Sequence, residues 1–249
     1  MAKPIIETYN LGKKYNIFSP SKKKRKFHLD SVLPFRDKKE VWALRNLDLK
    51  VEEGDIMAVM GSNGSGKSTL FRLLSEITDA SEGDIMLRGK VTSMIEVGVG
   101  FHVELTGREN IYFNGAVLGM SRKETERQFD EIVAFSGVEQ YLDVPIKKYS
   151  NGMYVKLAFA VASHLRTDIL LVDEVLSVSD HAFRQKSISK LKQLAHEGRT
   201  IMIVSHDTQV LRSLCKSALH LENGRMVDLG GFESVFSKFN TNKAGEEVL

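Results

Sequence analysis

A short stretch of the chain combines glycines, hydroxyl groups and a lysine in a spacing suited to binding phosphate. The stretch matches the pattern G-x-x-x-x-G-K-[ST]. Its residues are Gly61, Ser62, Asn63, Gly64, Ser65, Gly66, Lys67, Ser68 and Thr69. The glycines let backbone N–H groups turn toward one anion, Lys67 can reach the terminal phosphates of a nucleotide, and the Ser68 hydroxyl can ligate Mg²⁺. The stretch therefore predicts a site for a nucleoside triphosphate.

The segments on either side of this phosphate loop decide what the pattern means. The apolar run at 56–60 predicts a buried strand, and residues 69–74 suit a helix. The N-terminus of such a helix adds partial positive charge toward a phosphate. The alternative is a glycine-rich turn without a ligand, and the order strand, loop and helix disfavours it.

Polar residues that can act on a phosphate also follow two other apolar runs. Asp173 and Glu174 come after the run at 168–172, and His206 follows the run at 200–205. In an open parallel sheet, ligands bind beyond the carboxyl ends of the strands. We therefore expect Asp173 to hold the metal ion, Glu174 to polarise or deprotonate the attacking water, and His206 to hydrogen-bond the γ-phosphate. Each could instead be a surface residue that ends a strand, but three such ends beside one phosphate loop favour catalysis.

Strands alternate with helices along the chain. A helix that is apolar nearly all round is expected at 153–165, and another is expected to end at Gly198. Further strands are expected at 5–8, 44–51, 83–87 and, around an Asn223-Gly224 turn, at 219–221 and 226–227. This alternation predicts an α/β fold with a mainly parallel sheet and helices on both faces.

A helical region is expected between these strands. Two helices begin with capping boxes, at Thr106–Glu109 and at Ser121–Glu124, and the second is expected to end near Gly137. The glycine-rich stretch at 95–102 is expected to be a loop that changes direction. The helices are therefore inserted into the nucleotide-binding core.

The composition is that of a soluble globular protein. The chain has 249 residues, a net charge of +3 and one cysteine, Cys215, which is expected in the core. One cysteine cannot form an internal disulfide, which suits the reducing cytoplasm. No apolar run reaches about 18 residues, so we expect no membrane span. The small net charge does not require nucleic acid, and we expect no nucleic-acid partner.

Five consecutive cations, Lys22-Lys23-Lys24-Arg25-Lys26, lie in a basic insertion at about 19–40. Such a run is usually a solvated loop. It is equally suited to an anionic membrane surface or a lipid-linked pyrophosphate. The sequence leaves both interpretations open.

Four motifs together resemble a known family. In order and spacing, the phosphate loop, Tyr149–Gly152, Leu170–Glu174 and His206 resemble the motifs of the nucleotide-binding subunits of ABC transporters, over nearly the whole chain. The resemblance implies ATP hydrolysis with Mg²⁺. It also implies the P-loop ABC ATPase fold, whose mainly parallel sheet core carries an antiparallel β subdomain and an inserted helical subdomain. We expect one nucleotide-binding domain over 1–249, with the helical subdomain at about 95–165.

The resemblance assigns roles to residues beyond the phosphate loop. Ser150, Asn151 and Gly152 look like the family signature, which binds the γ-phosphate of ATP held by another subunit. Two copies then enclose two ATP molecules, which implies a homodimer that closes on ATP and opens after hydrolysis. The segment Val178-Ser179-Asp180 resembles the loop that joins the two sites across the dimer, so Asp180 is expected near the nucleotide.

An aromatic residue and an acidic residue complete the expected site. Tyr15 resembles the aromatic residue that stacks on adenine in this family. Trp42 is the alternative, and either side chain could instead belong to the core. Glu96 falls near the place of the glutamine that in the family senses the γ-phosphate and touches the membrane subunit.

Two longer segments indicate a subfamily. Gly98–Asn110 and Tyr149–Ala160 resemble segments of the ATP-binding subunits that export surface polysaccharides such as O-antigen, teichoic acid or capsule. This resemblance implies a polytopic membrane permease as partner, a lipid-linked polysaccharide as the exported substrate, and a peripheral position on the cytoplasmic face of the cell membrane. Some members carry a C-terminal carbohydrate-binding domain, for which no room is expected after Phe239.

Two other functions stay open at this point. One is an ABC subunit for a different exported substrate, such as a drug or a lipid, although the loop around Phe101 argues against it. The other is a soluble ABC ATPase that acts on DNA or the ribosome. Such proteins usually have a long coiled coil or two tandem ATPase domains, whereas this chain has one phosphate loop and no sustained heptads.

Overall fold

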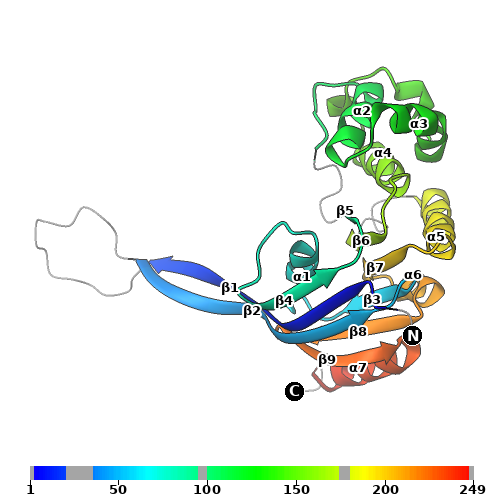
Figure 1. Cartoon of the computed structure of the whole chain (residues 1–249). Coiled ribbons are helices and arrows are strands. Elements are labelled where there is room, and N and C mark those ends of the chain that lie inside the picture. Colours follow the sequence, from blue (N-terminus) through cyan, green and yellow to red (C-terminus); the bar gives the residue numbers. More distant parts are fainter. Residues whose placement is uncertain (1–2, 21–35, 95–99, 174–179, 247–249) are drawn as a thin grey trace, which may run out of the picture.

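The computed structural model describes residues 3–20, 36–94, 100–173 and 180–246 (Figure 1). Its main sheet has six strands in the order β5-β6-β7-β3-β8-β9. They are β3 (Ile56–Met60), β5 (Val91–Met94), β6 (Ile169–Asp173), β7 (Thr200–Val204), β8 (Ser217–Glu222) and β9 (Arg225–Gly231). All neighbouring pairs are parallel except β8 and β9, which form the expected hairpin. The predicted mainly parallel sheet is therefore confirmed.

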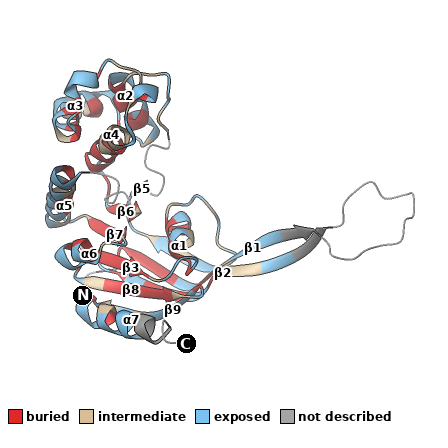
Figure 2. Ribbon diagram, turned by 180° about the vertical axis from the view of Figure 1, so that it is seen from behind, coloured by how far each residue is buried: buried red, intermediate tan, exposed pale blue. Residues whose placement is uncertain are grey.

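The central strands are buried on both faces (Figure 2). Successive side chains of a strand point to opposite faces, so Met57 and Val59 join the core with α1 (Lys67–Leu74), whereas Ile56 and Ala58 join a second core. The helices of this second core include α5 (His181–His196), α6 (Thr208–Leu214) and α7 (Phe232–Glu246). Cys215 belongs to the second core too, as expected. Burial on both faces explains the near-continuous apolar runs in the sequence.

A second, antiparallel sheet has the order β2-β1-β4. Its strands are β1 (Ile6–Pro20), β2 (Arg36–Val51) and β4 (Glu82–Leu87). Strands β1 and β2 are much longer than the predicted 5–8 and 44–51, and their outer halves project from the body as an arm (Figure 1). Tyr15 and Ile17 are exposed there. Apolar alternation marks only the strand segments that cover a core, so it missed the arm.

The predicted helical region consists of α2 (Gly107–Val117), α3 (Arg122–Ser136), two 3₁₀ turns and α4 (Asn151–Ser163). Both predicted capping boxes are present. In the first, the Glu109 amide donates to Thr106 Oγ1 at 3.2 Å and the Thr106 amide donates to Glu109 Oε2 at 2.8 Å. The two sheets and the helical insertion match the predicted layout of a mainly parallel core, an antiparallel β subdomain and a helical subdomain. The proposed domain limits stay predictions, because 21–35 and 95–99 lie outside the described residues.

Aromatic side chains join the helical region to the core. Phe159 of α4 is fully buried. Its ring centroid lies 5.9 Å from that of Phe135 on α3 and 5.9 Å from that of Phe183 on α5. Offset-stacked and edge-to-face pairs at this spacing are favourable beyond the area they bury. This cluster therefore fixes α4 against both of its neighbours.

We predict that Phe159→Ala lowers the free energy of unfolding by about 3–5 kcal/mol, because it leaves a cavity where three helices meet. Phe113→Ala is the control, since Phe113 on α2 is 44% exposed and its truncation opens no enclosed cavity, so it is expected to cost about 1 kcal/mol. Urea denaturation of the two variants measures both values. Equal costs for the two variants would contradict this account of the core.

Candidate functional site

The phosphate loop connects the end of β3 to the start of α1, as predicted. Gly66 precedes α1 with a φ of 109°, a left-handed conformation that favours glycine. No side chain caps the first turn of α1, and no acidic residue lies in it. The amides at this helix N-terminus are therefore suited to an anionic ligand.

Two glycines of the loop lie too close to neighbouring strands for any side chain. A Cβ on Gly66 would lie 2.7 Å from the Ala43 carbonyl oxygen and 2.7 Å from Leu44 Cδ2. A Cβ on Gly61 would lie 2.3 Å from the Leu221 carbonyl oxygen. The loop is thus held between β2 and the end of β8.

Lys67 and Ser65 place polar groups inside this loop. The Lys67 ammonium donates to the carbonyl oxygens of Gly61 and Ser62, both at 2.8 Å, so it lies within the curve of the loop. Ser65 is 2% exposed, and its hydroxyl has no hydrogen-bond partner among the described residues. Ammonium, amide and hydroxyl donors gathered around one curve fit a triphosphate.

The three predicted strand ends lie side by side. Strands β6, β7 and β3 are consecutive in the sheet, and Asp173 of β6 pairs in register with Val204 of β7. Asp173 ends β6, His206 follows β7, and the phosphate loop follows β3. The Ser68 hydroxyl donates to Asp173 Oδ2 at 3.5 Å. The sheet therefore brings a carboxylate, an imidazole and the phosphate loop to one edge.

Two cavities flank the phosphate loop. The first, of about 460 Å³, is lined by Tyr15, Ala43, Asn63, Gly64, Gly66, Lys67, Ser68, Thr69, Asp173 and Val204. The second, of about 370 Å³, is lined by Val59, Met60, Gly61, Ser62, Asn63, Lys67, Val204, Ser205, His206, Thr208, Leu211, Phe239 and Asn240. Sequence reasoning missed Phe239 and Asn240, because nothing in their pattern indicates that α7 reaches the phosphate loop.

The two aromatic candidates for adenine binding have different surroundings. Tyr15 lines the first cavity. Both rings carry cations: Lys13 Nζ lies 5.3 Å from the Tyr15 ring, whereas Lys14 Nζ lies 5.7 Å and Arg45 Cζ 4.9 Å from the Trp42 ring. The described lining of the first cavity does not include Trp42. The strand register explains the difference. Tyr15 pairs with Val41 and Lys14 pairs with Trp42, so Tyr15 and Trp42 point to opposite faces of the arm.

The signature residues stand apart from the phosphate loop of their own chain. Ser150 caps α4, and its hydroxyl accepts a hydrogen bond from the Met153 amide at 3.2 Å. Ser150 and Asn151 are exposed, and Gly152 is partly exposed. Neither cavity beside the phosphate loop includes these three residues in its described lining. The helix α4 thus presents its N-terminus to solvent.

Asp180 occupies a structural position at the start of α5. Its carboxylate accepts a hydrogen bond from the Phe183 amide at 2.9 Å and forms an ion pair with Lys156 of α4. The bond from Lys156 lowers the pKa of this carboxyl group, and the bond from Phe183 lowers it further. Asp180 therefore links α5 to α4. Glu96, Glu174, Val178 and Ser179 lie outside the described residues.

Within the described ranges, no three His, Cys, Asp or Glu side chains cluster as ligands for a metal ion. The same ranges contain no helix with the length and apolar character needed to cross a membrane. Ser68 and Asp173 lie beside each other at this site, and their hydroxyl and carboxylate oxygens are of the kind that Mg²⁺ prefers.

Solved structures of ATP-binding cassettes have the same fold as this chain. An ATP-binding subunit of an ABC transporter superposes with a TM-score of 0.76 at 20% identity, covering 95% of this chain and 93% of that one. A dimeric ATP-binding cassette in a post-hydrolysis state with ADP and Pi superposes with a TM-score of 0.72 at 21% identity. The match covers 91% of this chain and 98% of that one. At these identities the similarity supports the fold.

Sequence comparison supplies the family. The O-antigen export system ATP-binding protein RfbB of Klebsiella pneumoniae is 35% identical over 95% of this chain and 97% of its own length. The teichoic acids export ATP-binding protein TagH of Staphylococcus saprophyticus is 37% identical over 94% of this chain and 87% of its own length. RfbB of Myxococcus xanthus is 39% identical over 82% of this chain, which spans only 47% of that relative. A family model described as ABC transporter matches residues 44–177. The chain therefore belongs to the ABC transporter family, as one of its ATP-hydrolysing nucleotide-binding subunits.

Proposed function

We propose that this chain hydrolyses ATP to power the export of a lipid-linked surface polysaccharide through a membrane permease. The observation that carries the ATPase is the meeting of Asp173, His206 and the phosphate loop at one edge of the sheet. The polysaccharide is supported by the relatives named for O-antigen and teichoic acid export. An exporter of another substrate is the alternative.

Each residue at the ATP site has its own role in this proposal. Lys67 and the loop amides hold the phosphates, and Ser68 and Asp173 would hold Mg²⁺. Mg²⁺, when bound, neutralises charge that develops on the phosphate oxygens. His206 hydrogen-bonds the γ-phosphate, and Glu174 polarises or deprotonates the attacking water. Tyr15 stacks on adenine, consistent with its place in the cavity beside the loop.

A second copy of the chain completes each site in this proposal. Ser150, Asn151 and Gly152 are exposed or partly exposed, and no acidic residue lies in the first turn of α4. The N-terminus of α4 therefore offers backbone amides and partial positive charge to a phosphate. In one chain this N-terminus does not line the cavities beside the phosphate loop. In a homodimer it meets the ATP of the partner, and Asp180 lies between the two sites.

An exposed apolar pair on α2 suits the permease. Phe113 is 44% exposed and Val117 is 59% exposed, and their spacing of four residues places them on the same side of the helix. Neighbouring apolar side chains on a surface are a common feature of sites for protein partners. Contact with the permease would hold the chain as a peripheral protein at the cytoplasmic face of the membrane. The basic run Lys22–Lys26, which lies outside the described residues, would act on anionic lipid or the pyrophosphate of the carrier.

The function is tested by purifying the tagged chain from detergent-solubilised native membranes. We expect a polytopic permease to co-purify and to raise the ATPase rate, and mass spectrometry identifies it. Recovery of only ribosomal or DNA-bound material would contradict the export function and favour a soluble ABC ATPase.

We predict that Gly66→Ala destabilises the nucleotide-free protein more than Gly64→Ala. Both positions have positive φ, 109° and 79°, and this conformation costs a residue with a side chain about 1–2 kcal/mol. Only at Gly66 does the new Cβ meet backbone, at 2.7 Å from the Ala43 carbonyl oxygen. Thermal unfolding without nucleotide measures the difference, and equal losses would show that packing against β2 does not shape the loop.

We predict that Glu174→Gln lowers ATP turnover by at least about 100-fold, because an amide cannot accept the proton of the attacking water. ATP binding should persist, and gel filtration with ATP should show a dimer that no longer opens. Glu53→Gln, an exposed residue before β3, is the control with unchanged turnover. Normal turnover by the Glu174 variant would refute the role of this carboxylate.

We predict that replacing Lys22, Lys23, Lys24, Arg25 and Lys26 by glutamine reduces polysaccharide export more than it reduces ATPase activity. The reason is that these cations act on the membrane or the lipid carrier and not on ATP. Export is measured as surface glycan in cells, and ATP hydrolysis is measured on the purified complex. An equal loss of both, or a loss of neither, argues against the assignment.

A further inference from the structure

Helix α7 packs on β8 and β9 through an apolar face. Phe232 and Val235 are buried in the second core, and Phe236 and Phe239 are half-buried against it. Steps of three and four residues place these four side chains on one face of the helix. The face therefore extends from the start of α7 to Phe239.

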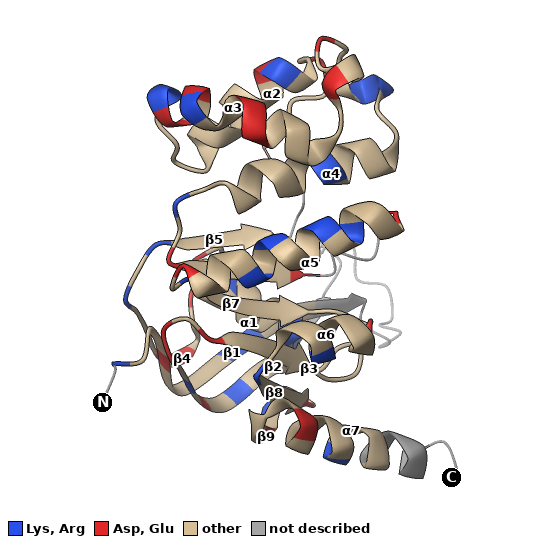
Figure 3. Ribbon diagram, turned by 90° about the vertical axis from the view of Figure 1, so that its right-hand side faces the viewer, with Lys and Arg blue, Asp and Glu red and all other residues tan. Residues whose placement is uncertain are grey.

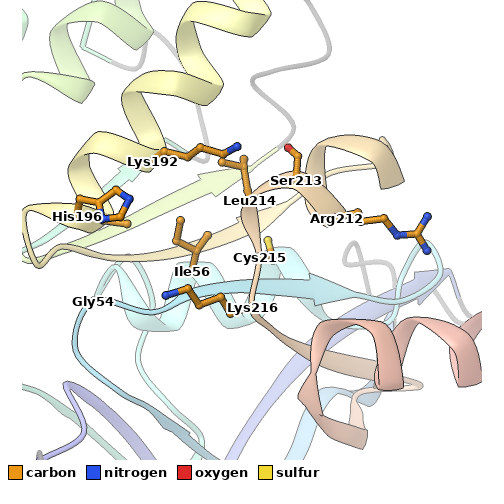
Figure 4. Close-up of a pocket in the computed structure, with 10 residues that line it drawn as sticks. Gly54, Ile56, Lys192, His196, Arg212, Ser213, Leu214, Cys215 and Lys216 are labelled. Atoms are coloured by element: carbon orange, nitrogen blue, oxygen red, sulfur yellow. The ribbon is translucent and has the colours of Figure 1, made fainter.

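Two ion pairs also join α7 to its neighbours. Arg212 of α6, labelled in Figure 4, donates to the two carboxylate oxygens of Glu233 at 2.6 and 3.0 Å. Lys238 donates to Asp228 Oδ2 of β9 at 2.8 Å, and Figure 3 shows α7 with its charged residues beside β9. Exposed ion pairs add little stability. They nevertheless join α7 both to the sheet and to α6, the helix that follows His206.

Phe239 lies beside the strand that adjoins the phosphate loop. Its ring packs edge-to-face on the ring of His220 on β8, with 5.0 Å between the centroids and 81° between the planes. His220 is 4% exposed, and burial lowers its pKa, so this imidazole is mainly neutral at pH 7. In the sheet His220 pairs with Met60, the residue before the phosphate loop. Phe239 is thus supported next to the start of the loop.

Phe239 also lines the cavity on the His206 side of the phosphate loop. This cavity of about 370 Å³ contains Lys67 and His206, and α7 contributes Phe239 and Asn240 to its described lining. The cavity on the Tyr15 side has no residue of α7 in its described lining. Asn240 is exposed. The ring of Phe239 is therefore the bulky group that α7 supplies to the wall.

The main chain around His206 is held by hydrogen bonds. The Asp207 amide donates to Ser205 Oγ at 3.1 Å. The Asp207 carboxylate caps α6 by accepting from the Gln209 and Val210 amides at 2.9 and 3.1 Å. With the backbone fixed, the remaining freedom of His206 is rotation of its side chain. Bulk in the cavity that the imidazole shares limits this rotation.

We propose that Phe239 is a positioning residue for His206. Supported by His220, its ring fills one wall of the cavity and keeps the His206 imidazole turned toward the phosphate loop. The inference rests on the γ-phosphate role proposed for His206 and names the side chain that holds the imidazole for it. A misplacement of about 1 Å can cost on the order of 100-fold in rate. A residue that only positions another can therefore control turnover.

Steady-state ATP hydrolysis by variants of the full chain tests the proposal, together with the binding of a fluorescent ATP analogue. We expect Phe239→Ala to lower kcat about tenfold with the Kd of the analogue within about twofold, because Lys67 and the loop amides are unchanged. Phe239→Tyr keeps the ring and should return most of the rate.

Phe236→Ala is the matched control. Phe236 is half-buried on the same face of α7, one turn earlier, and it is not part of the described lining of the cavity. Its kcat should equal that of the wild type, although its thermal stability should fall as in Phe239→Ala. Equal losses of kcat in the two variants would mean that α7 has only a structural role, and would overturn the proposal.

A double variant tests whether Phe239 acts through His206. Single-turnover hydrolysis should already be slow in His206→Ala, and adding Phe239→Ala should lower it by less than about twofold, because residues that act as one unit are not additive. A further tenfold loss in the double variant would overturn the proposal.

The single variants separate this inference from the role on which it rests. A slow His206→Ala with a normal Phe239→Ala would overturn the positioning role alone. Normal turnover in His206→Ala would refute the proposed role of His206, and the positioning role with it. If Phe239→Ala does not fold, Phe239→Leu retains apolar bulk against the core and gives the same comparison with Phe236→Ala.

Discussion

The parallel pairing of β6, β7 and β3 is the constraint on which the site depends. These strands are buried on both faces, and their register aligns Asp173 with Val204 and Ala58 with Ile203. A slip by one residue would turn every apolar side chain to the opposite face, so the two cores enforce the register. Because the strands are parallel, their carboxyl ends share one edge. A carboxylate, an imidazole and the phosphate loop consequently meet without any local motif that joins them.

The helical region has its own core and presents the start of α4 to solvent. Its helices pack on a core of their own and reach the sheet through the Phe135, Phe159 and Phe183 cluster. The start of α4 is capped by Ser150 and faces solvent, apart from the cavities of the phosphate loop. Helix N-termini bind anions well, so this end suits a phosphate that its own chain does not supply. Catalysis in this account therefore needs a second copy of the chain.

Local chemistry in the sequence predicted much of the site. The phosphate loop, the strand ends at Asp173 and His206, and the capping boxes at Thr106 and Ser121 all depend on neighbouring residues. The length of β1 and β2 could not be predicted, because the described side chains of the arm, such as Tyr15 and Ile17, are exposed and cover no core.

Contacts between distant segments could not be predicted from the sequence either. The arm register that separates Tyr15 from Trp42, and the approach of Phe239 to the phosphate loop, depend on tertiary packing.

The central claim is that each site combines the phosphate loop of one copy with the signature of another. Mixing Lys67→Ala with Ser150→Arg, each inactive alone, tests it most directly. The heterodimer has one site with both parts intact, so ATP hydrolysis should return in the mixture. A mixture as inactive as its components would contradict the shared site.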